Sequence, residues 1–265
     1  MSTHLRLLYI LWMVFFCLEV YAQDLGIQLD NQAASRGNFV WGSIIDVKDA
    51  NAISDEELKA LAGEAYNEMT ENFQSTRQNS PPAGFPKSSP SVMVALLAGD
   101  TLYFASSLKR GTIQNQITPF TVLSGRAVRS RVVYDVIIKE LYRCQCGAEI
   151  RLSDSEQGHA NGGACGEIMA SLYWSLDASS RSAQDLQGAR IVAVNGVGGE
   201  IEVVFTCSGR PLGRGAYGCS DFTHKLGLKT VDPIVNGNLD GRISIPPPFL
   251  DMVREPRHGT IVCPR

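Results

Sequence analysis

Hydrophobic positions near the start of the chain have the spacing of a helix. Apolar side chains recur every three or four residues from Leu58 to Phe73, which is typical of an amphipathic helix. Ser54 and Glu57 precede this stretch as a capping box, in which each side chain accepts a hydrogen bond from the backbone N–H of the other residue. A Pro- and Gly-rich run at 81–84 follows it. We therefore predict a helix that starts after Ser54 and ends before this run.

The pattern then changes to that of strands. Residues 91–97 are mostly apolar, Gly99 and Asp100 are typical of a tight turn, and residues 101–106 alternate between faces, so we predict a β-hairpin. Two further strands are expected at 190–194 and 200–206, with a turn between them.

The remaining segments give weaker patterns. Residues 127–142 have helical spacing, and residues 249–253 are expected to form one last helical turn. Residues 23–52 are mixed and polar, and we expect an irregular arm there. Because helices alternate with strands, the order of elements predicts an α/β sandwich with a largely single sheet.

A Gly-rich loop at 159–166 leads directly into a helix that is expected to end near residue 179. Cys165 and Glu167 stand at the start of this helix. A thiol at a helix N-terminus lies at the positive end of the helix dipole, which favours the metal-binding thiolate. A carboxylate two residues further along is placed to stand beside a metal-bound water. A Cys-x-Glu helix with cysteines downstream is the zinc deaminase pattern with Cys in place of the usual His.

The N-terminus has the features of a secretory signal peptide. Residues 7–18 are apolar, His4 and Arg6 precede them, and Val20-Tyr21-Ala22 fits a cleavage site. We expect residues 1–22 to be removed and the mature chain to be exported. No other stretch is long and apolar enough to cross a bilayer.

Six cysteines then remain, which are Cys144, Cys146, Cys165, Cys207, Cys219 and Cys263. An even number in an exported chain permits three disulfides, and it equally permits a three-thiolate metal site. One of Cys144 and Cys146 is expected to pair with Cys263. In a secreted protein, the alternative role of Cys165 is to form a disulfide bond with another cysteine.

A net charge of −3 gives the chain no excess of positive charge with which to bind nucleic acid non-specifically. Long nucleic acids are therefore less favoured as partners than small molecules.

Three stretches together resemble the cytidine deaminase-like superfamily, and more narrowly a group of secreted fungal deaminase-like proteins. They are the hairpin at 90–107, the helix start Ala164-Cys165-Gly166-Glu167, and Tyr217-Gly218-Cys219-Ser220-Asp221-Phe222. The resemblance covers about residues 54–230. It implies a three-layer α-β-α sandwich whose mixed sheet of about five strands is flanked by helices. The chain then divides into a signal peptide (1–22), an N-terminal arm and helix (23–89) and a deaminase-like domain (90–265).

The resemblance also implies a metal and a reaction. In that superfamily a zinc ion is held by one His or Cys from the first motif and two cysteines from the second. The matching residues here are Cys165, Cys207 and Cys219, and Glu167 matches the proton shuttle. The second motif is normally Pro-Cys-x-x-Cys, whereas here Thr206 replaces the proline and a long Gly/Arg loop separates the two cysteines. A disulfide between Cys207 and Cys219 is the alternative pairing.

The expected chemistry is hydrolysis of an amine on a nucleobase-like ring. Zinc lowers the pKa of bound water towards neutrality, and Glu167 would transfer the proton. The substrate is expected to carry an aromatic amine, and free base, nucleoside, nucleotide and nucleic acid all remain open. The expected export and the resemblance to this superfamily together suggest a role as a toxin or effector.

Other interpretations of the same residues remain open. His159 is a candidate substrate contact or substitute ligand, and its alternative is a loop histidine in solvent. A Cys-His nucleophile, with Cys165 attacking a carbonyl and His159 or His224 as base, lacks a supporting signature. Trp41 and Trp174 are expected in the core. The competing function is a non-catalytic, disulfide-stabilised interaction protein on the same scaffold.

Overall fold

The computed structural model describes most of the chain and shows an α/β fold. The residues that it describes are 23–109, 136–137, 164–178, 181–197, 200–206, 218–235 and 238–259. Within them, seven strands form one mostly antiparallel sheet, two short strands form a separate hairpin, and four α-helices accompany them. The α/β class is therefore confirmed, whereas the expected count of about five strands is too low.

The sheet has the strand order β1-β2-β4-β3-β5-β6, and all of these neighbours are antiparallel. The last strand, β7, pairs with β5 in parallel, beyond the end of β6. Parallel neighbours need a crossover connection, and α8 (Cys219–Lys225) lies in the segment that leads to β7. The strands are β1 (Gln28–Leu29), β2 (Trp41–Asp46), β3 (Val92–Ala98), β4 (Thr101–Ser106), β5 (Arg190–Val197), β6 (Glu200–Val204) and β7 (Lys229–Thr230), and β8 (Ile234–Val235) and β9 (Asn238–Leu239) form the separate hairpin.

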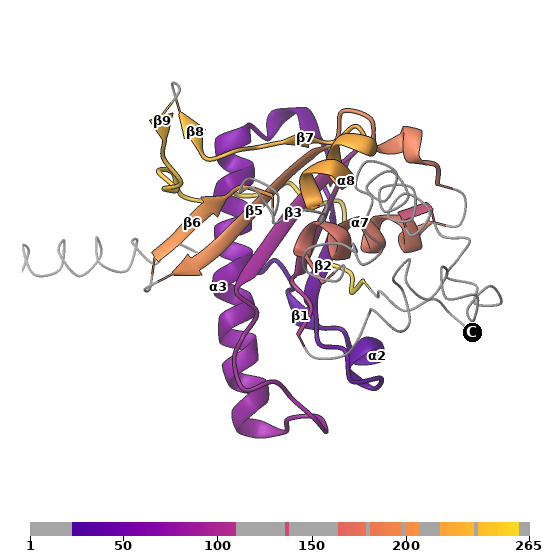
Figure 1. The fold of residues 1–265 in the computed structure, drawn as a ribbon, viewed down its shortest axis with the longest axis vertical. Helices are drawn as coiled ribbons and strands as arrows, with labels where there is room; N and C mark the ends of the chain where they lie inside the picture. Colours follow the sequence, from indigo (N-terminus) through magenta and orange to yellow (C-terminus); the bar gives the residue numbers. More distant parts are fainter. Residues whose placement is uncertain are drawn as a thin grey trace, which may run out of the picture.

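Helices cover both faces of the sheet and give the fold three layers (Figure 1). The long helix α3 (Asp55–Asn79) packs on one face, and α7 (Gly166–Asp177) and α8 pack on the other. On β3, Met93, Ala95 and Leu97 belong to the core beneath α3, and Val94 and Leu96 belong to the core beneath α7. Burial of both faces explains why this strand is an almost continuous apolar run.

The two clearest local predictions are confirmed. Ser54 and Glu57 form the capping box at the start of α3, with the Ser54 N–H donating to the Glu57 carboxylate at 2.7 Å. The predicted hairpin is β3 and β4, in which Ala98 pairs with Thr101. Gly99 sits in the turn with a φ of +58°, a conformation that glycine adopts at no steric cost.

Two expectations about the ends of the described chain are wrong. Residues 23–52 are not an irregular arm, because they contribute β1, the short helix α2 (Asn31–Ala34), β2 and a 3₁₀ turn, η1 (Ala50–Ala52). Strand β2 pairs along its length with β4, so this segment is part of the sheet. Residues 249–253 form no helical turn, because Met252 instead makes an isolated β-bridge to Val47. The expected signal peptide at 1–22 and most of the expected helix at 127–142 lie outside the described residues.

The C-terminal segment is attached to β2 by charge as well as by backbone hydrogen bonds. The Arg257 guanidinium donates to both carboxylate oxygens of Asp46, at 2.9 and 3.1 Å, and also to Asp177 at the end of α7. Its backbone pairs with Ile44. Arg257 therefore connects the first half of the sheet to the helix that begins at Cys165.

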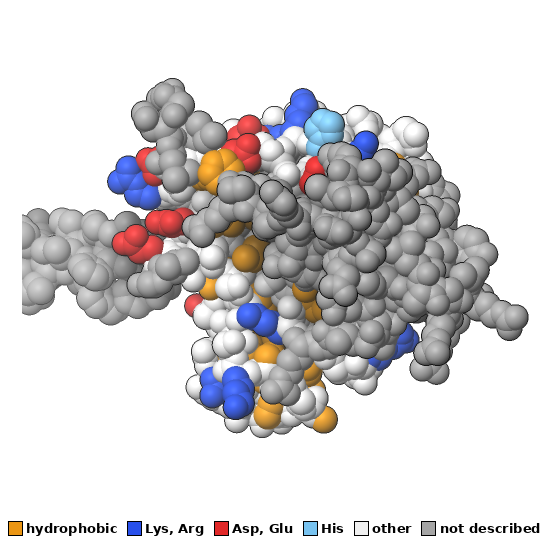
Figure 2. Space-filling model, viewed as in Figure 1, with side chains coloured by type: hydrophobic (Ala, Val, Ile, Leu, Met, Phe, Trp, Pro, Cys, Tyr) orange, Lys and Arg blue, Asp and Glu red, His pale blue; other side chains and the backbone are white. Residues whose placement is uncertain are grey.

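The described surface has no extended basic face in the view of Figure 2, where lysine and arginine side chains lie in separate small groups. No helix in the described part of the chain combines the length and the apolar composition needed to cross a bilayer.

Candidate metal centre

The first turn of α7 is held close to the sheet. The Leu108 N–H, just after β4, donates to the Ala164 carbonyl at 2.9 Å, and Cys165 follows as the residue that caps α7. Cys165 has an extended backbone, and its carbonyl accepts the N–H of Met169 at 3.1 Å. The predicted start of this helix is confirmed, and its end at Asp177 is two residues before the expected one.

Gly166 allows this close approach. A Cβ added at this position would lie 2.6 Å from Val94 Cγ2 and 3.2 Å from the Ala105 carbonyl oxygen. Any side chain here would therefore push the helix away from β3 and β4. The glycine between Cys165 and Glu167 has a packing role, which explains why the site can lie directly on the sheet.

Cys219 reaches the same place from another helix. It is the first residue of α8, whose N-terminal cap is Gly218. Both Cys219 and Phe222 belong to the core cluster that α7 shares with the sheet. The ligand atoms of Cys165, Glu167 and Cys219 all lie within 4.8 Å of one another, and the three side chains are buried.

These donors fit a zinc ion. Two thiolate sulfurs and a carboxylate are among the ligands that zinc prefers in proteins. Two sulfurs bound tetrahedrally at about 2.3 Å from zinc lie roughly 3.8 Å apart, so ligand atoms that already lie within 4.8 Å of one another need to close by about 1 Å at most. The N-terminus of α7 also favours the thiolate of Cys165 through the helix dipole.

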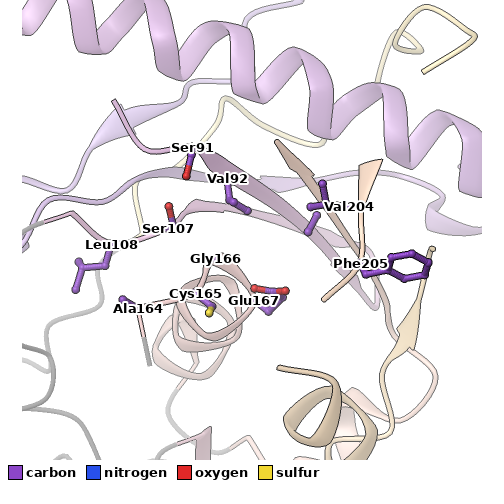
Figure 3. A pocket seen from close by; sticks show the side chains of 11 residues that line it. Ser91, Val92, Ser107, Leu108, Ala164, Cys165, Gly166, Glu167, Val204 and Phe205 are labelled. Carbon is purple, nitrogen blue, oxygen red and sulfur yellow. The ribbon is translucent and has the colours of Figure 1, made fainter. Parts of the chain in front are cut away.

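A cavity of about 280 Å³ opens beside this cluster. Figure 3 shows Cys165 and Glu167 in the first turn of α7, with Leu108 and Phe205 on opposite sides of them in this view. The cavity is therefore lined by both apolar and polar side chains. Its other lining residues include Ser91, Val92, Ser107, Ala193 and Val204.

The structure brings together three of the residues predicted for the site, Cys165, Glu167 and Cys219. Cys207 and His159 lie outside the described residues. The described chain before Cys207 ends at Thr206, and its neighbour Phe205 lines the cavity.

Phe205, Ser91 and Ser107 line the cavity but were not predicted as site residues from the sequence. A phenylalanine after an alternating strand has the same pattern as a core residue, yet Phe205 is 40% exposed. The available signal was its position two residues before Cys207. Trp41 and Trp174 are buried in the core, as predicted.

Comparisons of the chain with protein families, with curated proteins and with solved structures found no match. The function is therefore inferred from the residues of the site.

Proposed function

We propose that this chain is an exported, zinc-dependent hydrolytic deaminase that acts on the amine of a nucleobase-like ring. The observation that supports this most directly is the convergence of Cys165, Glu167 and Cys219 within 4.8 Å. Two of these residues, Cys165 and Glu167, also line a cavity. A metal beside a cavity favours catalysis, because a structural zinc is usually enclosed by four protein ligands.

Cys165 and Cys219 would hold the zinc, together with Cys207 as the third thiolate that the resemblance implies. Three protein ligands leave one position of a tetrahedral site open. When bound, zinc supplies Lewis acidity that lowers the pKa of water towards neutrality.

Glu167 moves the protons. Its side chain is only 3% exposed and its carboxylate lies beside the two sulfurs, so few solvent molecules compete for it. It accepts one proton as water adds to the amine-bearing carbon and passes it to the ring nitrogen, and it then takes the proton of the new hydroxyl group and passes it to the leaving amine. One water is consumed, ammonia leaves, and the ring carbon becomes a carbonyl.

The walls of the cavity suit a flat, partly polar ring. Val92, Val204 and Phe205 offer apolar surface, and the hydroxyls of Ser91 and Ser107 offer hydrogen bonds. The three-layer arrangement and the parallel pair β5 and β7 are compatible with the mixed, helix-flanked sheet that the resemblance implies.

The experiment is ammonia release by the zinc-loaded mature chain from cytosine, cytidine, adenine, adenosine and a short single-stranded oligonucleotide. We expect turnover of at least one compound by the wild-type protein and turnover at least about 10²-fold slower by a zinc-loaded Glu167→Gln variant. Full zinc occupancy without turnover of any of these compounds would contradict the proposal.

The alternative of a disulfide-stabilised interaction protein makes a different prediction. It requires that purified protein contain no zinc and no reactive thiols under denaturing conditions. The deaminase proposal requires three thiols that become reactive only when a chelator removes the metal.

A further inference from the structure

A second cavity adjoins the first one at Phe205. It has a volume of about 510 Å³, and Phe205 lines both cavities. Phe205 follows the end of β6, is 40% exposed and lines both cavities, so the two cavities meet at this side chain. Because they share this lining residue, the two cavities are placed to hold neighbouring parts of one ligand.

The second cavity has a different chemistry from the first. Its described lining includes the carboxylates of Asp221 and Asp232 and the imidazole of His224, together with several hydroxyls, and it includes no lysine or arginine. Oδ2 of Asp232 accepts from the Thr230 hydroxyl at 3.4 Å, and Oδ2 of Asp221 accepts from the Gly218 N–H at 3.5 Å. These contacts are long, and each carboxylate has further lone pairs for a ligand.

These acidic groups do not form a second metal site. Among the described residues, the group of three or more potential ligands that lies close enough for an ion is Cys165, Glu167 and Cys219. The lining of the second cavity instead offers hydrogen-bond acceptors and a negative field. Such a surface favours a ligand rich in hydroxyl donors and repels an anion.

We propose that the second cavity binds the sugar of a nucleoside and that its aspartates exclude phosphate. This inference rests on the proposed deaminase function and names its substrate class, an unphosphorylated nucleoside. The base lies beside Glu167 in the first cavity, the glycosidic bond passes Phe205, and the sugar hydroxyls donate to Asp232. A 5′-phosphate would face two carboxylates with no described cation beside them.

Asp232 is the residue to change, because Asp221 also caps the helix that begins at Cys219. Asp232→Asn keeps an acceptor for Thr230 and removes one negative charge. The matched control is Asp251→Asn, since Asp251 is an exposed aspartate that pairs with Lys48 at 2.8 Å and does not line the second cavity.

The experiment measures binding and turnover separately. Zinc-loaded Glu167→Gln protein is titrated calorimetrically with cytosine, cytidine and cytidine 5′-monophosphate and with the three adenine counterparts, and kcat/KM is measured for the active enzyme. We expect the preferred nucleoside to bind roughly tenfold more tightly than its base and its monophosphate. In Asp232→Asn the discrimination against the monophosphate should fall about fivefold, whereas Asp251→Asn should keep it.

The outcomes separate the two proposals. Equal or tighter binding of the monophosphate, equal binding of the free base, or no nucleoside binding at all overturns the assignment of the second cavity. If the enzyme turns over a compound and also gives one of these binding results, the deaminase proposal is still supported. Selective nucleoside binding by a protein that turns over none of the compounds supports the cavity and contradicts the deaminase.

Discussion

The sulfur of Cys165 lies within 4.8 Å of the sulfur of Cys219, although the two residues begin different helices. Both helices pack on the same face of the sheet, and Glu167 brings a carboxylate to the same point. Two thiols and a carboxylate that meet beside a cavity form a site suited to a metal and to proton transfer.

The first prediction separates metal binding from proton transfer. Glu167→Gln should retain zinc and lower kcat by about 10²- to 10⁴-fold, because the amide cannot accept the proton. Zinc content and ammonia release are measured on the same preparation. Glu71→Gln on the exposed side of α3 is the control, and it should leave both unchanged. Loss of zinc in Glu167→Gln would instead make this residue a ligand.

The second prediction concerns the close contact at Gly166. Gly166→Ala should weaken zinc binding and destabilise the fold by about 1–3 kcal/mol, because its Cβ meets Val94 and the Ala105 carbonyl. Zinc titration and urea unfolding measure the two effects. The double variant Gly166→Ala/Val94→Ala removes the closest contact and should recover part of the zinc affinity. Unchanged zinc affinity in the single variant would show that the position of α7 does not control the site.

Much of the fold around this site could be predicted from local sequence, because helix caps and hairpin turns depend on neighbouring residues. The Ser54 cap, the Gly99 turn and the start of α7 at Cys165 are examples. Strand β2 was missed because Gly42 interrupts its apolar run. A Cβ at Gly42 would lie 2.2 Å from the Phe104 carbonyl, so the glycine permits tight packing in the sheet rather than a loop.

The cavities could not be predicted, because they depend on long-range packing. Phe205 follows β6 and Asp232 follows β7, with α8 between them in the chain, yet both line the second cavity. His224, which the sequence offered only as a candidate base for Cys165, lines the same cavity. Their roles follow from the pairing of β5 with both β6 and β7.

The third prediction concerns Glu68 on α3, whose carboxylate accepts the N–H groups of Leu25 and Ile27. Burial raises the pKa of Glu68 to about 7, the N–H groups partly oppose this rise, and Asp24 adds to it. Because this acid has a higher pKa in the folded state, folding takes up a proton, and stability should fall as the pH rises from 4.5 through about 7.

Glu68→Gln should flatten this part of the pH dependence, since the amide does not titrate. Urea unfolding of both proteins at about pH 5 and about pH 8 provides the measurement. Glu71→Gln is again the exposed control. If the free energy of unfolding of Glu68→Gln differs between the two pH values by as much as that of the wild-type protein, the pH dependence comes from other groups.

The fourth prediction concerns the ion pairs of Arg257. Burial is the largest single influence on the pKa of Asp46 and raises it, but hydrogen bonds from Thr101 and Arg257 and the charge of Arg257 outweigh it, so the pKa lies below 3.8. The resulting stability is present above pH 3.8 and is lost as the pH falls through the lowered pKa.

Arg257→Gln should lower the free energy of unfolding at neutral pH by about 1–3 kcal/mol, because two carboxylates lose a charged donor. It should also reduce the loss of stability in acid. Arg242→Gln is the matched control, since Arg242 pairs with Asp240 on the exposed surface, where solvent screening leaves little stabilisation to lose. Equal effects of the two substitutions would show that Arg257 has no special role.

The central claim is that zinc is bound by the sulfurs of Cys165 and Cys219. X-ray absorption at the zinc edge, combined with metal analysis of the purified mature chain, tests it most directly. The account predicts about one zinc per chain with a sulfur shell at about 2.3 Å, and loss of that zinc in both Cys165→Ser and Cys219→Ser. A protein without zinc, or with zinc bound only by nitrogen and oxygen, would contradict it.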